Sequence, residues 1–419
     1  MHPLFIAALV AATGALAAPG ETAPAPPASA GSEEERKKLE ADIAKELGAA
    51  PGASAAPPSA GPGTPPADAG ATPAAPAQGQ AGGNPFARIL LLPDISAIGS
   101  FALAWNQLDA GALSPRSDPF APAHTVQPVF QELELGLQAV VDPYARADAF
   151  LAFGSEGVEI EEAYLTTLGL PLSLQARAGK LFAPFGRVNQ QHGHVWDFVD
   201  RPLALVRLLA PDGLKGPGLD VAWLAPVSWY AELHLAYLAA APAFEPSERN
   251  GGYARLVQFF DVGDTSTLGV GVSAGRLQEQ GGGGSRDLLG ADAYLKIRPA
   301  RSRSYVALQA EVVARHLDGA APPDGAALAI DVPGTAWGGY VQAVLRDGPY
   351  VEYGVRVERA PAEVGGGEER ASLLAAWLPS EFERLRAQLS YDRLPGGRDG
   401  LEALLQLEFA IGAHGAHPF

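Results

Sequence analysis

Residues 400–419 read GLEALLQLEFAIGAHGAHPF, and their polarity alternates with a period of two. One face carries the apolar side chains of Leu401, Ala403, Leu405, Leu407, Phe409 and Ile411. The opposite face carries Glu402, Gln406 and Glu408, with Leu404 as its apolar exception. This period predicts a β-strand with one apolar and one polar face. By itself the stretch fits a soluble sheet as well as a membrane-spanning one, so the rest of the chain has to distinguish them.

The composition of the whole chain limits the kinds of protein that it can form. The 419 residues suffice for two or three ordinary domains or for one large barrel. Hydrophobic residues make up 47%, but beyond the amino terminus no apolar run approaches the roughly 20 residues of a membrane-spanning helix. A membrane protein of this composition would therefore have to be a closed barrel. The absence of cysteine excludes disulfides, and a net charge of -17 argues against nucleic-acid binding.

Residues 1–17 have the features of a secretory signal peptide. A short apolar run from residue 4 onward ends in Ala15-Leu16-Ala17, an A-x-A-like cleavage pattern. The basic residues that usually begin a signal peptide are missing, and the alternative is a buried core helix. We expect cleavage near Ala17 to release the mature chain into the cell envelope.

Residues 18–93 are rich in Pro, Ala and Gly, which predicts a disordered periplasmic linker. Ser32 and Glu35 form a capping box and Gly48 is a stop signal, so we expect one short helix over residues 33–48. The helix fits three roles: a coiled-coil tie between copies of the chain, a dock for a periplasmic partner, or a solvated spacer. Two heptads are too few to decide among them.

Beyond the linker, segments of alternating polarity repeat, and each is long enough to cross a bilayer. Residues 129–141, for example, place Leu133 and Leu135 opposite Glu134. A strand needs about 9–11 residues to span the hydrocarbon region. Short turns alternate with longer polar or glycine-rich connections, which is typical of an up-and-down barrel with two rims. The connections predict an all-β fold, a transmembrane antiparallel up-and-down β-barrel of about 16 strands over residues 94–419.

Two stretches resemble outer-membrane porins of Gram-negative bacteria. An amphipathic last strand that ends in phenylalanine resembles the sorting signal recognised by the outer-membrane assembly machinery, and here it contains Phe409 and Phe419. The sequence GKLFAPFG at residues 179–186 resembles a stretch of phosphate-selective and related porins. The resemblance implies a barrel in contact with membrane lipid, assembled as a homotrimer. The chain departs from the phosphate-selective pattern, because its barrel lysines are only Lys180, Lys215 and Lys296.

The longest connection, residues 183–216, resembles the constriction loop that folds into the channel of general porins. One or two helical turns are expected at residues 202–209. The candidate pore-constriction residues are Arg187, His192, His194, Asp197, Asp200 and Arg201 in the loop and Glu132, Glu134, Arg356, Arg384 and Arg386 on the wall. Charges of both signs across a pore favour small polar solutes and disfavour apolar ones. The alternative is that each residue is merely a solvated lumen side chain.

These features predict a water-filled outer-membrane porin for passive diffusion of small polar solutes, narrowed by the loop. No catalytic triad, phosphate-binding loop or convergent carboxylate pair stands out, so we expect neither enzymatic activity nor a cofactor. The second hypothesis is a substrate-specific or zinc-linked uptake barrel, with His192 and His194 as metal ligands. Residues 18–93 are too rich in Pro and Ala to form the plug of a TonB-dependent receptor. The third hypothesis is a structural or enzymatic barrel whose lumen is closed to solutes.

Deletion of Phe419 tests the sorting signal. We expect less folded, heat-modifiable barrel in the outer membrane than for the full-length chain under the same promoter. The conductance of the barrels that do assemble should not change, because Phe419 lies beyond the last expected strand. Equal amounts of folded barrel would show that the terminal phenylalanine is not recognised.

Overall fold

The computed structural model describes residues 93–108, 124–155, 157–240, 250–278, 284–319, 333–362 and 365–412. The expected signal peptide, the helix at residues 33–48 and Phe419 lie outside these residues, as does the linker up to residue 92. No helix in the described part of the chain is long and apolar enough to cross a membrane.

Sixteen strands within the described residues form one closed antiparallel barrel, which confirms the fold expected from the sequence. They are β1 (Asp94–Asn106), β2 (Gln127–Asp142), β3 (Ala145–Gly154), β4 (Gly157–Thr167), β5 (Leu174–Phe182), β6 (Lys215–Leu224), β7 (Tyr230–Leu238), β8 (Gly251–Asp261), β9 (Thr267–Gln278), β10 (Gly284–Ile297), β11 (Tyr305–Gly319), β12 (Gly334–Asp347), β13 (Val351–Pro361), β14 (Gly367–Trp377), β15 (Glu383–Leu394) and β16 (Arg398–Gly412). The described connections contain the 3-10 helices η1 (Pro171–Ser173), η2 (Val188–Gln190) and η3 (Gly193–Val195), and the α-helix α4 (Leu203–Leu208).

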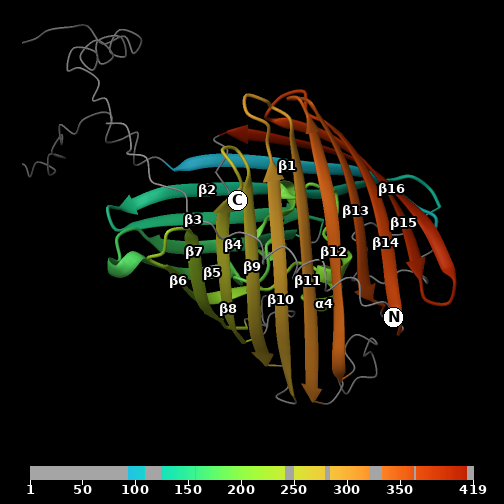
Figure 1. The fold of residues 1–419 in the computed structure, drawn as a ribbon. Coiled ribbons are helices and arrows are strands. Elements are labelled where there is room, and N and C mark those ends of the chain that lie inside the picture. Colours follow the sequence, from blue (N-terminus) through green and yellow to red (C-terminus); the bar gives the residue numbers. More distant parts are fainter. Residues whose placement is uncertain are drawn as a thin grey trace, which may run out of the picture. The chain divides into compact units, whose positions relative to one another are not determined.

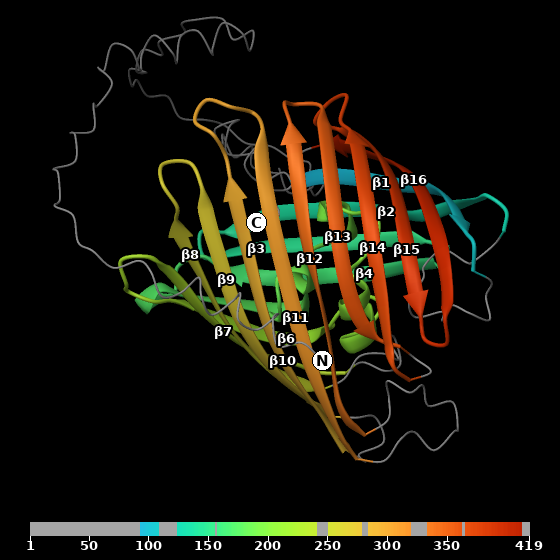
Figure 2. The same cartoon turned by 45° about the vertical axis from the view of Figure 1, so that its right-hand side comes forward.

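The barrel closes through the pairing of its first and last strands. β16 runs antiparallel to β1, from Ser96 opposite Gly412 to Asn106 opposite Glu402. Each of the other strands pairs with its two neighbours in chain order, so the sheet has no free edge. In Figures 1 and 2, strands β10–β14 cross in front of β2–β4, as tilted strands do in a closed barrel, and α4 lies between the two walls.

Side chains alternate between an apolar outside and a polar inside, and β13 shows this clearly. Tyr353 and Val355 are about half exposed on the outer face, whereas Arg356 and Glu358 are buried on the inner face. Within a bilayer only a closed barrel or a helix satisfies every backbone polar group, and a lipid-facing wall must be apolar. The closed barrel and its apolar exterior therefore place the chain in a bacterial outer membrane.

Three β-bulges interrupt the alternation in the described strands, and one of them falls at Val141, close to the turn between β2 and β3. The other bulge of β2 falls at Gln131, because Ser100 of β1 faces Glu132 while Phe101 faces Phe130. In β4 the partners of β3 skip Glu161 in the same way. A bulge inserts one unpaired residue and redirects a side chain. The strand periodicity in the sequence did not reveal any of these bulges.

Part of the interior of the barrel is apolar. Leu238, Leu277, Leu288 and Val313 point inward and are almost completely buried. Leu238 and Leu277 lie at the ends of β7 and β9, and Leu288 and Val313 lie within β10 and β11. All four pack against the connection between β5 and β6. This part of the lumen is therefore a hydrophobic core.

The helix expected at residues 202–209 is present as α4. The preceding Pro202 cannot extend a helix toward the amino terminus, and Leu203, Leu205 and Leu208 are buried. The predicted end of the long connection is wrong by two residues, because Lys215 and Gly216 already pair with β5 as part of β6.

The substitution Val355→Arg tests the assignment of the outer face. Val355 lies midway along β13 on the exposed side, so an arginine there should lower the free energy of unfolding by about 2–4 kcal/mol in a vesicle refolding assay. Gln138→Arg is the control, because Gln138 faces the lumen and donates to Asp148 at 2.9 Å. Equal effects of the two substitutions would mean that the assignment is wrong.

Candidate functional site

The connection between β5 and β6, residues 183–214, folds into the barrel and is called the lumen loop below. Asn189 joins its two ends, since its Nδ2 donates to the carbonyl oxygens of Ala183 and Leu214 at 3.0 Å each. Its Oδ1 accepts from the backbone N–H of Leu214 and from Arg201, at 2.8 and 3.0 Å. Burial lowers the pKa of Arg201 to about 10, so the guanidinium remains charged at neutral pH. The base of the loop is thus closed by polar contacts.

Two glycines of the GKLFAPFG stretch are required by the backbone. Gly179 has a φ of 144°, and a Cβ there would overlap the carbonyl oxygen of Ala163 on β4. Gly186 has a φ of 63°, and a Cβ there would overlap the carboxyl group of Glu311. The backbone N–H of Gly186 donates to Ser273 Oγ at 3.0 Å. The glycines therefore let the chain pack closely against the wall and turn into the lumen.

An apolar contact fixes one side of the lumen loop. Phe185, Leu205 and Leu208 are completely buried, and they share a cluster with Leu238 and Val313 of the wall. Full burial of one such side chain contributes about 1.5–3 kcal/mol. The loop and this part of the wall therefore form one folded unit.

Asp200 fixes the loop to the opposite part of the wall. Its Oδ1 accepts from Arg356 at 2.5 Å and from Gln388 at 2.7 Å, and its Oδ2 accepts from Arg370 at 2.8 Å. Burial raises the pKa of this carboxyl, but Arg356 and Arg370 outweigh burial and hold the pKa below its usual range. The stabilisation by these ion pairs is therefore present above the unfolded-state pKa of about 3.9, and it is lost as the pH falls through the lower folded-state value.

Two arginines of β15 bind the backbone of the loop. Arg386 donates to the carbonyl oxygens of Trp196 at 2.6 Å and of Phe198 at 2.9 Å. Arg384 donates to the carbonyl oxygen of His194 at 2.7 Å. Buried carbonyl groups outside regular secondary structure need such donors.

His192 sits among carboxylates of β2 and β4. Its Nδ1 is 2.9 Å from Glu134 and 3.0 Å from Glu161, and its Nε2 is 2.9 Å from Glu162. The other oxygen of Glu162 accepts from the backbone N–H of Phe182 at 2.8 Å. Burial lowers the pKa of His192, but the three carboxylates outweigh burial and raise the pKa well above its usual value.

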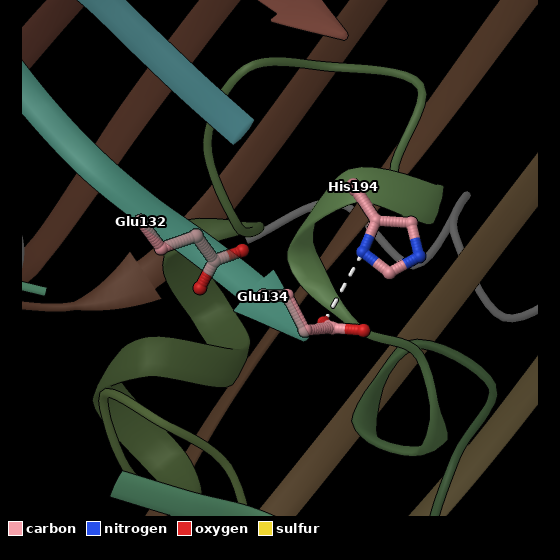
Figure 3. A group of neighbouring side chains, drawn as sticks. All are labelled: Glu132, Glu134 and His194. Carbon is pink, nitrogen blue, oxygen red and sulfur yellow. Dashed lines mark ion pairs between the residues drawn. The ribbon is translucent and has the colours of Figure 1, made fainter. Parts of the chain in front are cut away.

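His194 approaches the same wall two residues later. Its Nδ1 is 3.3 Å from Glu134 Oε2. Figure 3 shows the carboxyl groups of Glu132 and Glu134, both on β2, next to the imidazole of His194 on the loop. Together with His192 and Glu161, these side chains form the histidine–carboxylate cluster. Imidazole and carboxylate groups are the usual nitrogen and oxygen ligands of zinc.

The candidate constriction residues fall into two sets. Those buried between loop and wall are His192, His194, Asp200, Arg201, Glu134, Arg356 and Arg386. Those that keep intermediate exposure are Arg187, Asp197, Glu132 and Arg384. The guanidinium of Arg187 lies 4.0 Å from the ring centroid of Tyr294, and Asp197 accepts from Gln342 at 2.8 Å. Burial raises the pKa of Asp197, and the charge of Glu352 adds to the effect.

Several residues of the site were not found from the sequence. Glu161, Glu162, Asn189 and Gln388 all contact the loop or lie within it. Two consecutive acids, Glu161 and Glu162, were a usable signal of a bulge in the strand. Neighbouring strand residues face the same side only at such an irregularity. Asn189 and Gln388 had no signal that distinguished them from other polar residues.

The lysine of the GKLFAPFG stretch is held by an acid. Lys180 lies 3.4 Å from Glu159, and Lys215 contacts the same carboxylate. Two of the three barrel lysines therefore have an anionic partner already, which agrees with the departure from the phosphate-selective pattern.

Comparisons with known proteins support the fold. No protein-family model matches the sequence. An uncharacterized protein of Aquifex aeolicus (strain VF5) is 29% identical over 388 residues, which cover 80% of this chain and 82% of that protein. The anion-selective porin from Comamonas acidovorans is similar in structure, with a TM-score of 0.52 at 12% identity over 76% of this chain and 99% of the porin. The trimer form of the outer-membrane protein OmpT of Vibrio cholerae has a TM-score of 0.50 at 10% identity. The match covers 76% of this chain and 99% of the OmpT chain. The fold is thus that of outer-membrane porins.

The substitution Asp200→Asn tests how the loop is held. It leaves Arg356 and Arg370 with one acid fewer, so the loop should be less stable by about 3 kcal/mol. We expect the folded barrel to form but the loop to become sensitive to protease. The control is Asp212→Asn, an exposed position in the same loop. Equal protease resistance of the two variants would mean that Asp200 does not hold the loop.

Proposed function

We propose that the chain is a passive diffusion channel for small polar solutes in the outer membrane, narrowed by the lumen loop. The observation that carries this proposal is the loop itself, which crosses the interior and contacts β2 and β4 as well as β13–β15. A loop held at this depth leaves less of the lumen for a passing solute. The water-accessible charges beside it would then select the solute.

The residues that keep intermediate exposure carry both signs of charge. Arg187 and Asp197 belong to the loop, while Arg384 and Glu408 form an ion pair of 2.9 Å on the wall. Asp197 lies within electrostatic reach of Arg384 and Arg187. Opposed charges across a passage favour hydrated polar solutes. Arg187, Asp197, Glu132 and Arg384 are therefore the pore-lining residues in this proposal.

The proposal includes a homotrimer and assembly from a cleaved secretory precursor. The supporting observations are the trimer form of the structurally similar OmpT and the short apolar run ending at Ala17. Phe409, in the expected sorting signal, stacks on Phe101 at 6.3 Å between ring centroids, beside the closing pair of strands. Crosslinking of the native protein measures the oligomeric state.

Planar-bilayer recording tests the channel. We expect stepwise conductance from the purified barrel. Arg187→Gln should shift the reversal potential in a KCl gradient toward cations, and Asp197→Asn should shift it toward anions, because each removes one charge beside the passage. Asp212→Asn, at an exposed loop position, serves as the control and should leave the reversal potential unchanged. A folded barrel that never conducts would refute the proposal.

A further inference from the structure

The histidine–carboxylate cluster joins three separate segments of the chain. Glu132 and Glu134 come from β2, Glu161 from β4, and His192 and His194 from the lumen loop. The cluster contains two sets of three possible ligand atoms, and within each set the atoms lie no more than 4.8 Å apart. Both sets contain Glu134. One set adds Glu161 and His192, and the other adds Glu132 and His194. This spacing brings several metal-ligand types to one place on the inner wall.

The wall departs from regular structure at this place. Because β4 is bulged at Glu161, both Glu161 and Glu162 reach His192, although regular strand neighbours face opposite sides. Ile160, next to them, points outward and is 52% exposed. Bulges often redirect a side chain beside a functional site. The bulge therefore brings a second carboxylate of β4 to His192, in addition to Glu134 of β2.

His192 is oriented like a metal ligand whose second ring nitrogen is held by a carboxylate, which is called its outer support below. Its Nε2 faces Glu162, which is itself held by the backbone N–H of Phe182. A carboxylate that accepts from one ring nitrogen orients the other nitrogen toward a metal. In His192 the other nitrogen is Nδ1, which faces Glu134 and Glu161.

We propose that Glu134, Glu161 and His192 bind a divalent transition-metal ion of the zinc type, with His194 as the candidate fourth ligand. The imidazole makes zinc a better match than magnesium or calcium, which prefer oxygen ligands alone. His194 is the candidate because its Nδ1 lies 3.3 Å from Glu134 Oε2, the atom that also faces His192.

The ion has a structural role in this proposal. His192 is only 2% exposed and Glu134 is equally buried, so the ion is enclosed between loop and wall rather than located in the water-accessible passage. It would join the loop to β2 and β4, while Asp200 joins the same loop to β13 and β14. The ion is therefore a clamp on the lumen loop and not a transported solute.

Calorimetric titration of zinc chloride into the purified, chelator-treated barrel tests the site. We expect one zinc ion to bind per chain. The barrel with bound zinc should unfold at a higher temperature than the metal-free barrel. His192→Ala should abolish binding, and Glu162→Gln, which alters only the outer support, should weaken it by about 10–100-fold. Visible absorption of bound cobalt(II) should show a low coordination number that includes nitrogen. Magnesium should give neither heat nor a thermal shift.

Two controls separate this site from other histidines. His234→Ala removes a histidine that is likewise 3.2 Å from two acids, Asp220 and Glu232, and it should leave zinc binding intact. His414 and His417 form a second histidine pair in the sequence and lie outside the described residues. A double substitution, His414→Ala with His417→Ala, should also leave zinc binding intact. No binding to the folded wild-type barrel, or binding that survives His192→Ala, would overturn the proposal. Heat-modifiability shows whether each variant is folded. Conductance is measured separately, so failure of the metal site would leave the channel proposal intact.

Discussion

The pairing of β1 with β16 is the constraint on which the rest of the structure depends. In hydrocarbon no water is available for backbone N–H and C=O groups, and each unsatisfied group costs several kcal/mol. The register from Ser96 opposite Gly412 to Asn106 opposite Glu402 removes the two edges that an open sheet would expose. Once the sheet is closed, its two faces have different surroundings, and the alternation of apolar and polar side chains follows.

A closed barrel of this size leaves an interior, and the lumen loop occupies part of it. The loop has only short helical turns, so many of its carbonyl groups lack partners within the loop. Arginines of the wall supply the missing donors, as Arg386 does for Trp196 and Phe198. Those arginines are acceptable in a buried place because acids such as Asp200 and Glu408 accompany them. Arginines of the wall thus donate hydrogen bonds to carbonyl groups of the loop, and Asp200 of the loop forms ion pairs with arginines of the wall.

The interior is divided as a result. Around Phe185 and Leu208 it resembles the core of a soluble domain, whereas around Asp200 it is a network of ion pairs. Charged groups that the loop does not bury, such as Arg187 and Asp197, remain partly open to water. In the proposed channel these residues therefore act on solutes. The buried charges fix the position of the lumen loop and with it the width of the passage. A metal ion at His192 would add a third kind of attachment for the same loop.

The sequence alone determined the barrel, its sixteen strands and the short helix at α4, because period-two alternation, turn residues and a proline are local properties of the chain. It also identified the lumen loop and most charged residues that contact it. Only the tertiary structure decided that Asp200 is buried by Arg356 while Asp197 keeps partial exposure, and that Glu161 turns inward at a bulge. These outcomes depend on the strand register and on the path of the loop. Both bring residues far apart in the chain, such as Glu134 and His192, to hydrogen-bonding distance.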